Sequence, residues 1–341
     1  MAEAGTLEQR AQRGDPHAQL DLARMLEAQG RHELARGWYG RLFQGGDRQG
    51  LRLLAISLLK NEPLNPEQGV AMIKAAAASG DGEAQSICAA LAAQDDALDD
   101  HWSVALRYLN SAAENGMAPA RRELAIVGAD FPSLLAPKPF EFMSRDPRIL
   151  VGRGFASAPE CDWLVEMARP RTVAAQLYDP HTGKGFESRN IRDNSAAAFG
   201  ILETGILLCA MRSRLKASLA LDGHHFEPLM VLHYETGQQF APHFDFIDPD
   251  QPGLHEDIAQ KGQRVATLLI YLNDDFTGGE TAFAKLGCSF KGGKGDALMF
   301  WNIDEEGRPD RRMLHAGMPP LSGEKWVLSQ WIRRHCTLGD P

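Results

Sequence analysis

A glycine that returns at nearly constant spacing constrains the first 130 residues more than any other feature of the chain. It stands before aspartate at Gly14, Gly46 and Gly80 and before methionine at Gly116, so the intervals are 32, 34 and 36 residues. Glycine directly after a helix end is a common C-terminal stop, and the runs before these glycines suit helices. Eight residues after the second member of each pair comes an alanine, whose small side chain lets neighbouring helices approach closely: Ala23, Ala55, Ala89 and Ala125.

This spacing predicts a repeat architecture. A helical pair every ~34 residues is the tetratricopeptide period, and the Ala-Ala-x-x-Gly endings at 76–80 and 112–116 resemble the Sel subfamily of those repeats. We therefore expect residues 1–130 to form an α-solenoid of tetratricopeptide- or Sel-like repeats. Such arrays present a concave face that commonly binds peptides or other proteins. Two kinds of role stay open for this domain: docking a partner protein, or a purely structural role in which it stabilises the rest of the chain or forms the contact of a possible homodimer.

Composition excludes several other classes of protein. The net charge of -9 argues against nucleic-acid binding, which needs a basic surface. No run approaches the ~18 consecutive apolar residues of a membrane span, and the first residues lack the pattern of a signal peptide. Five scattered cysteines without Cys-x-x-Cys spacing suggest free thiols rather than a disulfide framework, so we expect a cytoplasmic protein. They are Cys88, Cys161, Cys209, Cys288 and Cys336.

The rest of the chain has a different pattern. Four prolines within residues 128–147 and no helical period predict a linker over 131–147, followed by a second domain over 148–341. Ser157 to Glu160 predicts a capped helix start, and 199–221 predicts one long amphipathic helix. Helices followed by short strands fit a jelly roll (a double-stranded β-helix) with buttressing helices, so the whole chain is predicted to be α+β. The predicted strands are 226–235, 238–246, 263–273, 280–284, 288–291, 296–301, 311–316 and 325–333.

Three side chains of the second domain suggest a metal site. His243 and Asp245 stand two residues apart on a predicted strand, so both can point to one face. His315 ends another predicted strand. Two imidazoles and one carboxylate form the facial triad that holds a non-haem Fe(II) and leaves its other coordination positions open. The alternative is a histidine bonded to a surface carboxylate, together with an unrelated turn histidine.

Several sequence blocks around these residues carry a family resemblance. In chain order they are Tyr234 with Gly237-Gln238, His243-Phe-Asp245, Arg264 and Thr267, Tyr271-Leu-Asn273, Gly278-Gly-Glu-Thr281 with Phe283, Gly295-Asp-Ala-Leu298 with Phe300, His315, Gly323, Lys325-Trp326 and Trp331. The segment from about 145 to 335 resembles the Fe(II)/2-oxoglutarate-dependent oxygenases, and most of all their prolyl 4-hydroxylase branch. That resemblance implies a jelly-roll fold, and Fe(II), 2-oxoglutarate, O2 and ascorbate as cofactors and co-substrates. It also implies a protein or peptide substrate hydroxylated at proline.

The resemblance also implies roles for single residues. Lys325 would bind the distal carboxylate of 2-oxoglutarate, with Tyr234 and Thr281 adding hydroxyl groups. An apolar neighbourhood supports this role for Lys325, because a buried ammonium needs a partner. The alternative is an ordinary solvated lysine. Trp331 is expected to form a wall of the pocket.

The substrate side leaves more alternatives open. Arg264 matches an arginine that touches the peptide in prolyl hydroxylases, but an ion pair with one of the loop acids Asp248, Asp250, Glu256 or Asp257 is equally compatible with the sequence. The loop 246–263 is a candidate lid. Two positions depart from the prolyl enzymes: Phe240 stands where they carry tyrosine, and Arg333 is also unexpected. Hydroxylation of another residue or of a small molecule therefore stays possible, as does a non-catalytic interaction protein working through its repeats.

Overall fold

The computed structural model describes residues 6–334, except 96, 99, 129, 179–184, 187, 189, 201 and 222–224. The chain divides into two compact units. One is helical and contains Met1–Gly128 together with the short segment Leu202–Cys209. The other contains Ala129–Ile201 and Ala210–Pro341 and is rich in strands. A piece from the second half of the chain therefore belongs to the helical unit.

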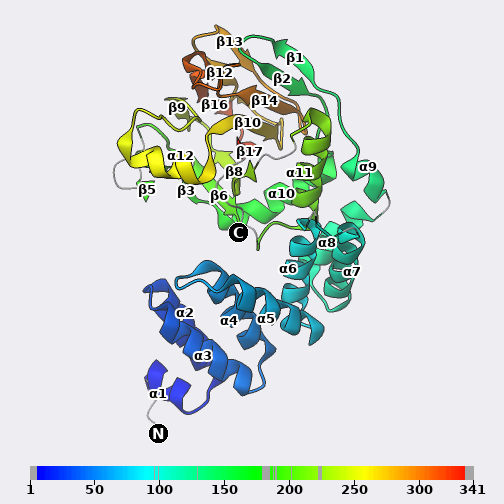
Figure 1. The fold of residues 1–341 in the computed structure, drawn as a ribbon, viewed down its shortest axis with the longest axis vertical. Helices are drawn as coiled ribbons and strands as arrows, with labels where there is room; N and C mark the ends of the chain where they lie inside the picture. Colours follow the sequence, from blue (N-terminus) through cyan, green and yellow to red (C-terminus); the bar gives the residue numbers. More distant parts are fainter. Residues whose placement is uncertain are drawn as a thin grey trace. The chain divides into compact units, whose positions relative to one another are not determined.

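The helical unit consists of consecutive helices joined by tight corners (Figure 1). The four repeated glycines, Gly14, Gly46, Gly80 and Gly116, all lie just after a helix end and have φ between +87° and +94°. Glycine reaches this left-handed conformation without a Cβ penalty, so it ends each helix cleanly. The helices are α1 (Leu7–Gln12), α2 (Pro16–Ala28), α3 (His32–Gln44), α4 (Arg48–Lys60), α5 (Pro66–Ala78), α6 (Gly82–Ala93), α7 (His101–Glu114) and α8 (Ala118–Val127).

The residue after three of these glycines starts the next helix. The side chains of Asp15, Asp47 and Asp81 accept backbone N–H groups in the first turns of α2, α4 and α6, which satisfies donors that have no partner within the helix. Gly50 allows one of the closest approaches, because a Cβ there would lie 2.5 Å from the backbone nitrogen of Phe43. The helical prediction for this region is confirmed.

The alanines of the repeat form much of the helical core. Ala23, Ala55 and Ala89 are at most 1% exposed. Ala125, which occupies the same place in the last repeat, is exposed. Close helix packing at this position therefore ends before α8, where no further repeat covers the helix.

The predicted linker is more ordered than its prolines indicated. It contains the short helix α9 (Phe131–Leu135) and the strand β1 (Glu141–Ser144), which pairs with β2 (Ile149–Gly152). Proline is compatible with α9, because Pro132 lies in its first turn and Asp130 caps that turn. The prediction that this segment has no helical structure was therefore wrong for α9, and β1 contains no proline.

The strand-rich unit contains two main antiparallel sheets (Figure 1). The larger has the order β1-β2-β14-β10-β17-β8-β6-β3, with β7 also paired to β17, and the smaller has the order β13-β12-β15-β9. The further strands of the larger sheet are β3 (Val173–Ala174), β6 (Ser195–Phe199), β7 (His225–Phe226), β8 (Leu229–Tyr234), β10 (Arg264–Tyr271), β14 (Ala297–Trp301) and β17 (Lys325–Arg333). The smaller sheet contains β9 (Phe240–His243), β12 (Thr281–Phe283), β13 (Cys288–Phe290) and β15 (His315–Gly317).

Both sheets contribute to one core, as expected for a jelly roll. Leu269, Leu298 and Phe300 of the larger sheet pack with Phe283 and Phe290 of the smaller one. Two minor pairs complete the strands, β4 (Leu177–Tyr178) with β5 (Gly185–Phe186) and β11 (Thr277–Gly278) with β16 (Pro320–Ser322). The predicted fold class is therefore confirmed.

Two helices of this part of the chain test the predicted boundaries. The helix α10 (Ala158–Ala168) begins with the predicted capping box, in which Ser157 and Glu160 satisfy each other's backbone N–H groups. The single helix predicted over 199–221 was wrong. Its start belongs to β6, where Phe199 pairs with Leu229, and α11 runs only from Ile206 to Leu219. Strand pairing overrides helix propensity at Phe199.

The start of α11 lies in the helical unit and is capped from a distance. Leu207 donates its backbone N–H to Glu123 Oε1 at 2.8 Å. Burial raises the pKa of Glu123 to about 7, although these backbone donors oppose the shift. A Cβ at Gly205 would lie 2.5 Å from the same carboxylate, so glycine makes room for the cap.

The loop 246–263 also contains regular structure. It forms the short 3-10 helix η2 (Pro252–Leu254) and the helix α12 (His255–Lys261). The predicted strand 311–316 is likewise split into η3 (Arg311–Met313) and β15. The four described cysteines form no disulfide with one another, and Cys336 lies outside the described residues. Among the described residues no helix has the length and apolar character needed to span a membrane.

Candidate active site

The three predicted metal ligands lie together in the strand-rich unit. His243 ends β9 and His315 begins β15, and the two residues are paired across neighbouring strands. Asp245 lies two residues beyond the end of β9, where the chain leaves the sheet, rather than within a strand as predicted. One ligand atom from each side chain lies within 4.8 Å of the other two. A single ion can therefore contact all three.

Hydrogen bonds direct both imidazoles toward this point. Nδ1 of His243 lies 2.9 Å from the carbonyl oxygen of Ala241, and Nδ1 of His315 lies 3.0 Å from that of Met313. A carbonyl only accepts, so each Nδ1 carries the proton and each Nε2 keeps a free lone pair. This is the tautomer that a metal needs from a histidine ligand.

The carboxylate of Asp245 is ionised although it is buried. Burial by itself raises the pKa of Asp245, but the neighbouring His315 and His243 and the hydroxyl of Thr267 hold it below its usual range. Burial lowers the pKa of His243 to about 3, and His315 beside it adds to the shift. The site therefore presents neutral nitrogen and anionic oxygen, the donor set that suits Fe(II) with open coordination positions.

The three ligands border a cavity that opens to solvent. Alternate residues of β17 face it, because successive side chains of a strand point to opposite faces. Lys325 and Trp331, predicted to bind co-substrate and to form a wall, both line it. Further lining residues come from β8 and its neighbours: Met230, Leu232, Tyr234, Phe240, Leu269, Thr281, Gly317, Val327, Ser329 and Arg192.

Lys325 is buried and its ammonium lies between two aromatic rings. Nζ is 5.1 Å from the ring centroid of Tyr234 and 5.3 Å from that of Tyr271. Within the described part of the chain no carboxylate lies at ion-pair distance from it. Burial lowers the pKa of Lys325 to about 7, with Glu280 opposing the shift. The cavity therefore contains an ammonium whose charge lacks a partner, which favours an anionic ligand.

The two predicted hydroxyl groups also reach the cavity. Tyr234 is paired with Lys325 across β8 and β17, and its hydroxyl would lie 3.1 Å from a Cβ at Gly317, so glycine gives it space. The hydroxyl of Thr281 lies 3.0 Å from that of Tyr271, which in turn donates to the carbonyl oxygen of Phe290. The single Tyr271 proton is used there, so Thr281 donates to Tyr271.

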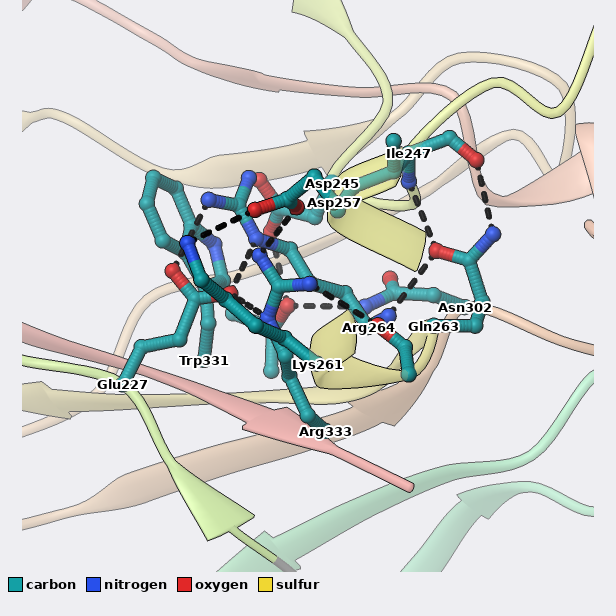
Figure 2. Close-up of polar contacts among 12 residues, drawn as sticks. Glu227, Asp245, Ile247, Asp257, Lys261, Gln263, Arg264, Asn302, Trp331 and Arg333 are labelled. Carbon is teal, nitrogen blue, oxygen red and sulfur yellow. Dashed lines mark hydrogen bonds and ion pairs between the residues drawn. The ribbon is translucent and has the colours of Figure 1, made fainter. Parts of the chain in front are cut away.

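Arg264 does not line the cavity. Its Nε and Nη2 donate to the two carboxylate oxygens of Glu227 at 2.6 and 2.9 Å, and its guanidinium stacks 3.6 Å from the ring centroid of Trp331 (Figure 2). The structural ion pair that the sequence allowed is present, but with Glu227 rather than with an acid of the loop. Arg264 reaches the cavity only through Trp331.

A second arginine shares the same carboxylate. Arg333 donates to Glu227 at 2.6 Å and to Asp257 of α12 at 2.8 Å (Figure 2). Burial raises the pKa of Glu227, but the two arginines outweigh it and hold that pKa below its usual range. The departure noted at Arg333 therefore has a structural consequence, because it ties the α12 segment to β17.

Sequence reasoning missed one charged residue of the cavity. Arg192 is 5% exposed and lies in a stretch that carried no motif. Its hydrogen-bond acceptors are neutral, namely Asn194 Oδ1 at 2.9 Å and the Gln176 carbonyl oxygen at 3.4 Å, and its guanidinium lies over the ring of Phe240. Arg192 stands two residues before Asn194, a spacing that would place both side chains on one face of a strand. That spacing does not tell a buried arginine from a surface one.

Two further residues are explained by packing. Phe240 stacks on His243 with ring centroids 3.5 Å apart, so this departure from the prolyl enzymes keeps an aromatic ring beside the metal ligand. His233, a further histidine of β8, points to the other face of that strand from Tyr234. It stacks on Trp326 and contacts Glu324 through Nε2 at 2.8 Å.

Comparison with known proteins agrees with this geometry. Residues 229–333 match the family model of the 2OG-Fe(II) oxygenase superfamily. Prolyl 4-hydroxylase 1 of Arabidopsis thaliana is 35% identical over 211 residues, which cover 58% of this chain and 72% of that protein. Prolyl 4-hydroxylase subunit alpha-1 of Rattus norvegicus is 33% identical over 214 residues, 61% of this chain and 40% of that protein.

Solved structures are also similar over parts of the chain. The viral collagen prolyl hydroxylase of Paramecium Bursaria Chlorella virus-1 is 29% identical, with a TM-score of 0.40 over 55% of this chain and 96% of that one. For the repeats, a Sel1 repeat protein from Oxalobacter formigenes is 22% identical, with a TM-score of 0.31 over 36% of this chain and 51% of that one. From the sequence matches we conclude that the chain belongs to the 2OG-Fe(II) oxygenase superfamily, in its prolyl 4-hydroxylase branch, whose members use Fe(II), 2-oxoglutarate and O2.

Proposed function

We propose that this protein hydroxylates a proline residue of a protein or peptide, using Fe(II) and 2-oxoglutarate. One observation carries the proposal: the converging donors of His243, Asp245 and His315 border the same cavity as the buried, unpaired ammonium of Lys325. The first set suits an iron ion, and the second suits the far end of a dicarboxylate. Close relatives named prolyl 4-hydroxylases support proline as the target.

The residues divide the work as follows. His243, Asp245 and His315 hold the iron, and Lys325 binds the distal carboxylate of 2-oxoglutarate with help from the Tyr234 hydroxyl. Bound iron and 2-oxoglutarate supply the oxidising chemistry that inserts one oxygen atom of O2 into a C–H bond. The apolar lining from Leu232, Leu269 and Val327 keeps water away from that chemistry. We include ascorbate as the reductant that keeps the iron in the ferrous state.

Thr281 does not act as a second hydroxyl donor beside Tyr234. Its proton is used toward Tyr271, so its oxygen faces the cavity as an acceptor. An acceptor suits the ammonium of Lys325 and not a carboxylate. We therefore propose that Thr281 presents an acceptor oxygen to the cavity and does not donate to 2-oxoglutarate.

The substrate side differs from the pattern expected for prolyl enzymes. Arg264 is paired with Glu227 and does not line the cavity, whereas Arg192 does, and the aromatic walls are Phe240 and Trp331. Aromatic rings suit the apolar ring of proline, and Arg192 can donate to a peptide carbonyl.

The helical unit has its own proposed role. We propose that its repeats dock the substrate protein in the cytoplasm, because stacked helical repeats present extended binding surfaces. The competing role is a contact between two copies of the chain. Deleting residues 1–128 and measuring turnover on a short peptide and on the intact substrate protein separates them. Docking predicts loss on the intact protein alone.

The test uses proteins extracted from a strain that lacks this gene. Purified enzyme, Fe(II), ascorbate and 2-oxoglutarate are added, and mass spectrometry searches for peptides that gain one oxygen atom. Modified proline, absent with the Lys325→Met variant, supports the proposal. Succinate formation without a modified peptide would move the substrate to a small molecule. Iron binding with neither signal would contradict hydroxylation altogether.

A further inference from the structure

A chain of buried hydrogen bonds ends on the proposed iron ligand Asp245. Thr267 of β10 contacts Asp245 Oδ2 through its hydroxyl oxygen at 2.8 Å, and Asn302 contacts that same hydroxyl oxygen through Nδ2 at 3.0 Å. Asn302 follows β14, so three separate elements meet here. Thr267 and Asn302 are at most 1% exposed, so water does not compete for these bonds.

The direction of the chain follows from the charge of Asp245. An ionised carboxylate only accepts, so the single proton of the Thr267 hydroxyl points to Asp245. The Thr267 oxygen can then only accept from Asn302, which fixes the orientation of the Asn302 amide. The chain runs from the Asn302 N–H through the Thr267 O–H to the carboxylate.

The oxygen of the Asn302 amide shows that this orientation is energetically unfavourable for the side chain itself. Its Oδ1 is buried and has no hydrogen-bond partner among the described residues, which is rare for a buried polar atom and unfavourable. The backbone of Asn302 is held on both sides, because its N–H donates to Val265 and its carbonyl accepts from Asp310. A residue kept here for stability alone would be apolar, so the N–H of the amide has a specific use.

We propose that Asn302 and Thr267 are positioning residues that fix the orientation of the Asp245 carboxylate toward the iron. This inference rests on the proposed iron site. With Oδ2 held by the Thr267 hydroxyl, the carboxylate keeps its two oxygens in fixed places, Oδ2 3.4 Å from Nε2 of His315 and Oδ1 3.6 Å from Nε2 of His243. The two residues touch neither iron nor substrate and act only through Asp245.

The experiment titrates the full-length protein with Co(II), whose visible absorption reports coordination number. Thr267→Val removes the hydroxyl at nearly constant volume, Thr267→Ser retains it, and Asn302→Leu removes the donor together with the unpaired Oδ1. Loss of such outer partners typically weakens metal binding 10- to 100-fold. We expect that loss for Thr267→Val with an altered spectrum, a smaller loss for Asn302→Leu, and rescue by Thr267→Ser.

Thermal unfolding of the metal-free proteins separates positioning from stability. Asn302→Leu should unfold at or above the wild-type temperature while it binds Co(II) more weakly. Wild-type affinity and spectrum in Thr267→Val or Asn302→Leu would overturn the inference, as would affinity that falls only in parallel with stability. Failure of the iron site itself looks different: the wild-type protein would bind no Co(II), or His315→Ala would bind it equally well.

Discussion

The two units of this protein reach stability and function by different kinds of contact. In the helical unit, partners lie about one repeat apart, as in the buried ion pair between Arg52 and Asp81. In the strand-rich unit, His243 and His315 are 72 residues apart in the sequence and paired in the sheet. The helical unit spreads its stability over many similar interfaces between repeats. In the strand-rich unit, one small set of side chains forms the proposed active site. Changes to single residues should therefore affect stability in the first unit and activity in the second.

The largest expected effect comes from the metal site. His315→Ala removes one of three iron ligands, so turnover of 2-oxoglutarate should fall at least about 1000-fold, equivalent to about 4 kcal/mol. Succinate formation and bound iron measure it. His233→Ala is the matched control on the same unit and should keep both. An equal loss of turnover and bound iron in His233→Ala would show that replacing any histidine of these sheets disturbs the site by changing the fold.

Lys325→Met should have the next largest effect. Losing a charge-assisted hydrogen bond of about 1.5–3 kcal/mol should raise the KM for 2-oxoglutarate roughly 10- to 100-fold. Stability should not fall, because the removed ammonium is buried without a carboxylate partner. Lys291→Met removes an exposed lysine and serves as control. An unchanged KM in Lys325→Met would contradict its role in binding.

The helical unit should show the reverse behaviour. Gly50→Ala places a Cβ 2.5 Å from the Phe43 backbone nitrogen, which cannot move cheaply, so unfolding should become easier by about 1–3 kcal/mol. Turnover on a short peptide should be unchanged. Gly40→Ala is the control, because its Cβ meets nothing within 4 Å and alanine favours a helix by about 1 kcal/mol. Equal stability of the two variants would remove the close-packing explanation.

The smallest expected effect is a pH dependence of co-substrate binding. Lys325 has a pKa of about 7 without an anion beside it, and only its protonated form attracts a carboxylate. Below pH 7 the dissociation constant of 2-oxoglutarate should be constant. Above pH 7 it should rise about tenfold per pH unit, about 1.4 kcal/mol. Calorimetric titration of the metal-loaded protein from pH 6 to 9 measures it, and a flat profile would contradict the low pKa.

The sequence predicted features that depend on local chemistry. The glycines at the repeat corners and the capping box at Ser157 require only neighbours a few residues away, and the structure contains both. The predicted ligands His243, Asp245 and His315 and the predicted residues Lys325 and Trp331 came from the family resemblance, and in the structure all five line one cavity. These roles in binding stay predictions until they are measured.

Tertiary structure decided the rest. Phe199 joins a strand because β8 offers it a partner, and Arg264 leaves the cavity because Glu227, 37 residues earlier, supplies a second charge. Arg192, Thr267 and Asn302 gain their places at the site from burial and from partners far along the chain. The local sequence predicts which secondary structure a residue favours. The charge state of its side chain and the way that side chain points depend on the atoms that surround it once water is excluded.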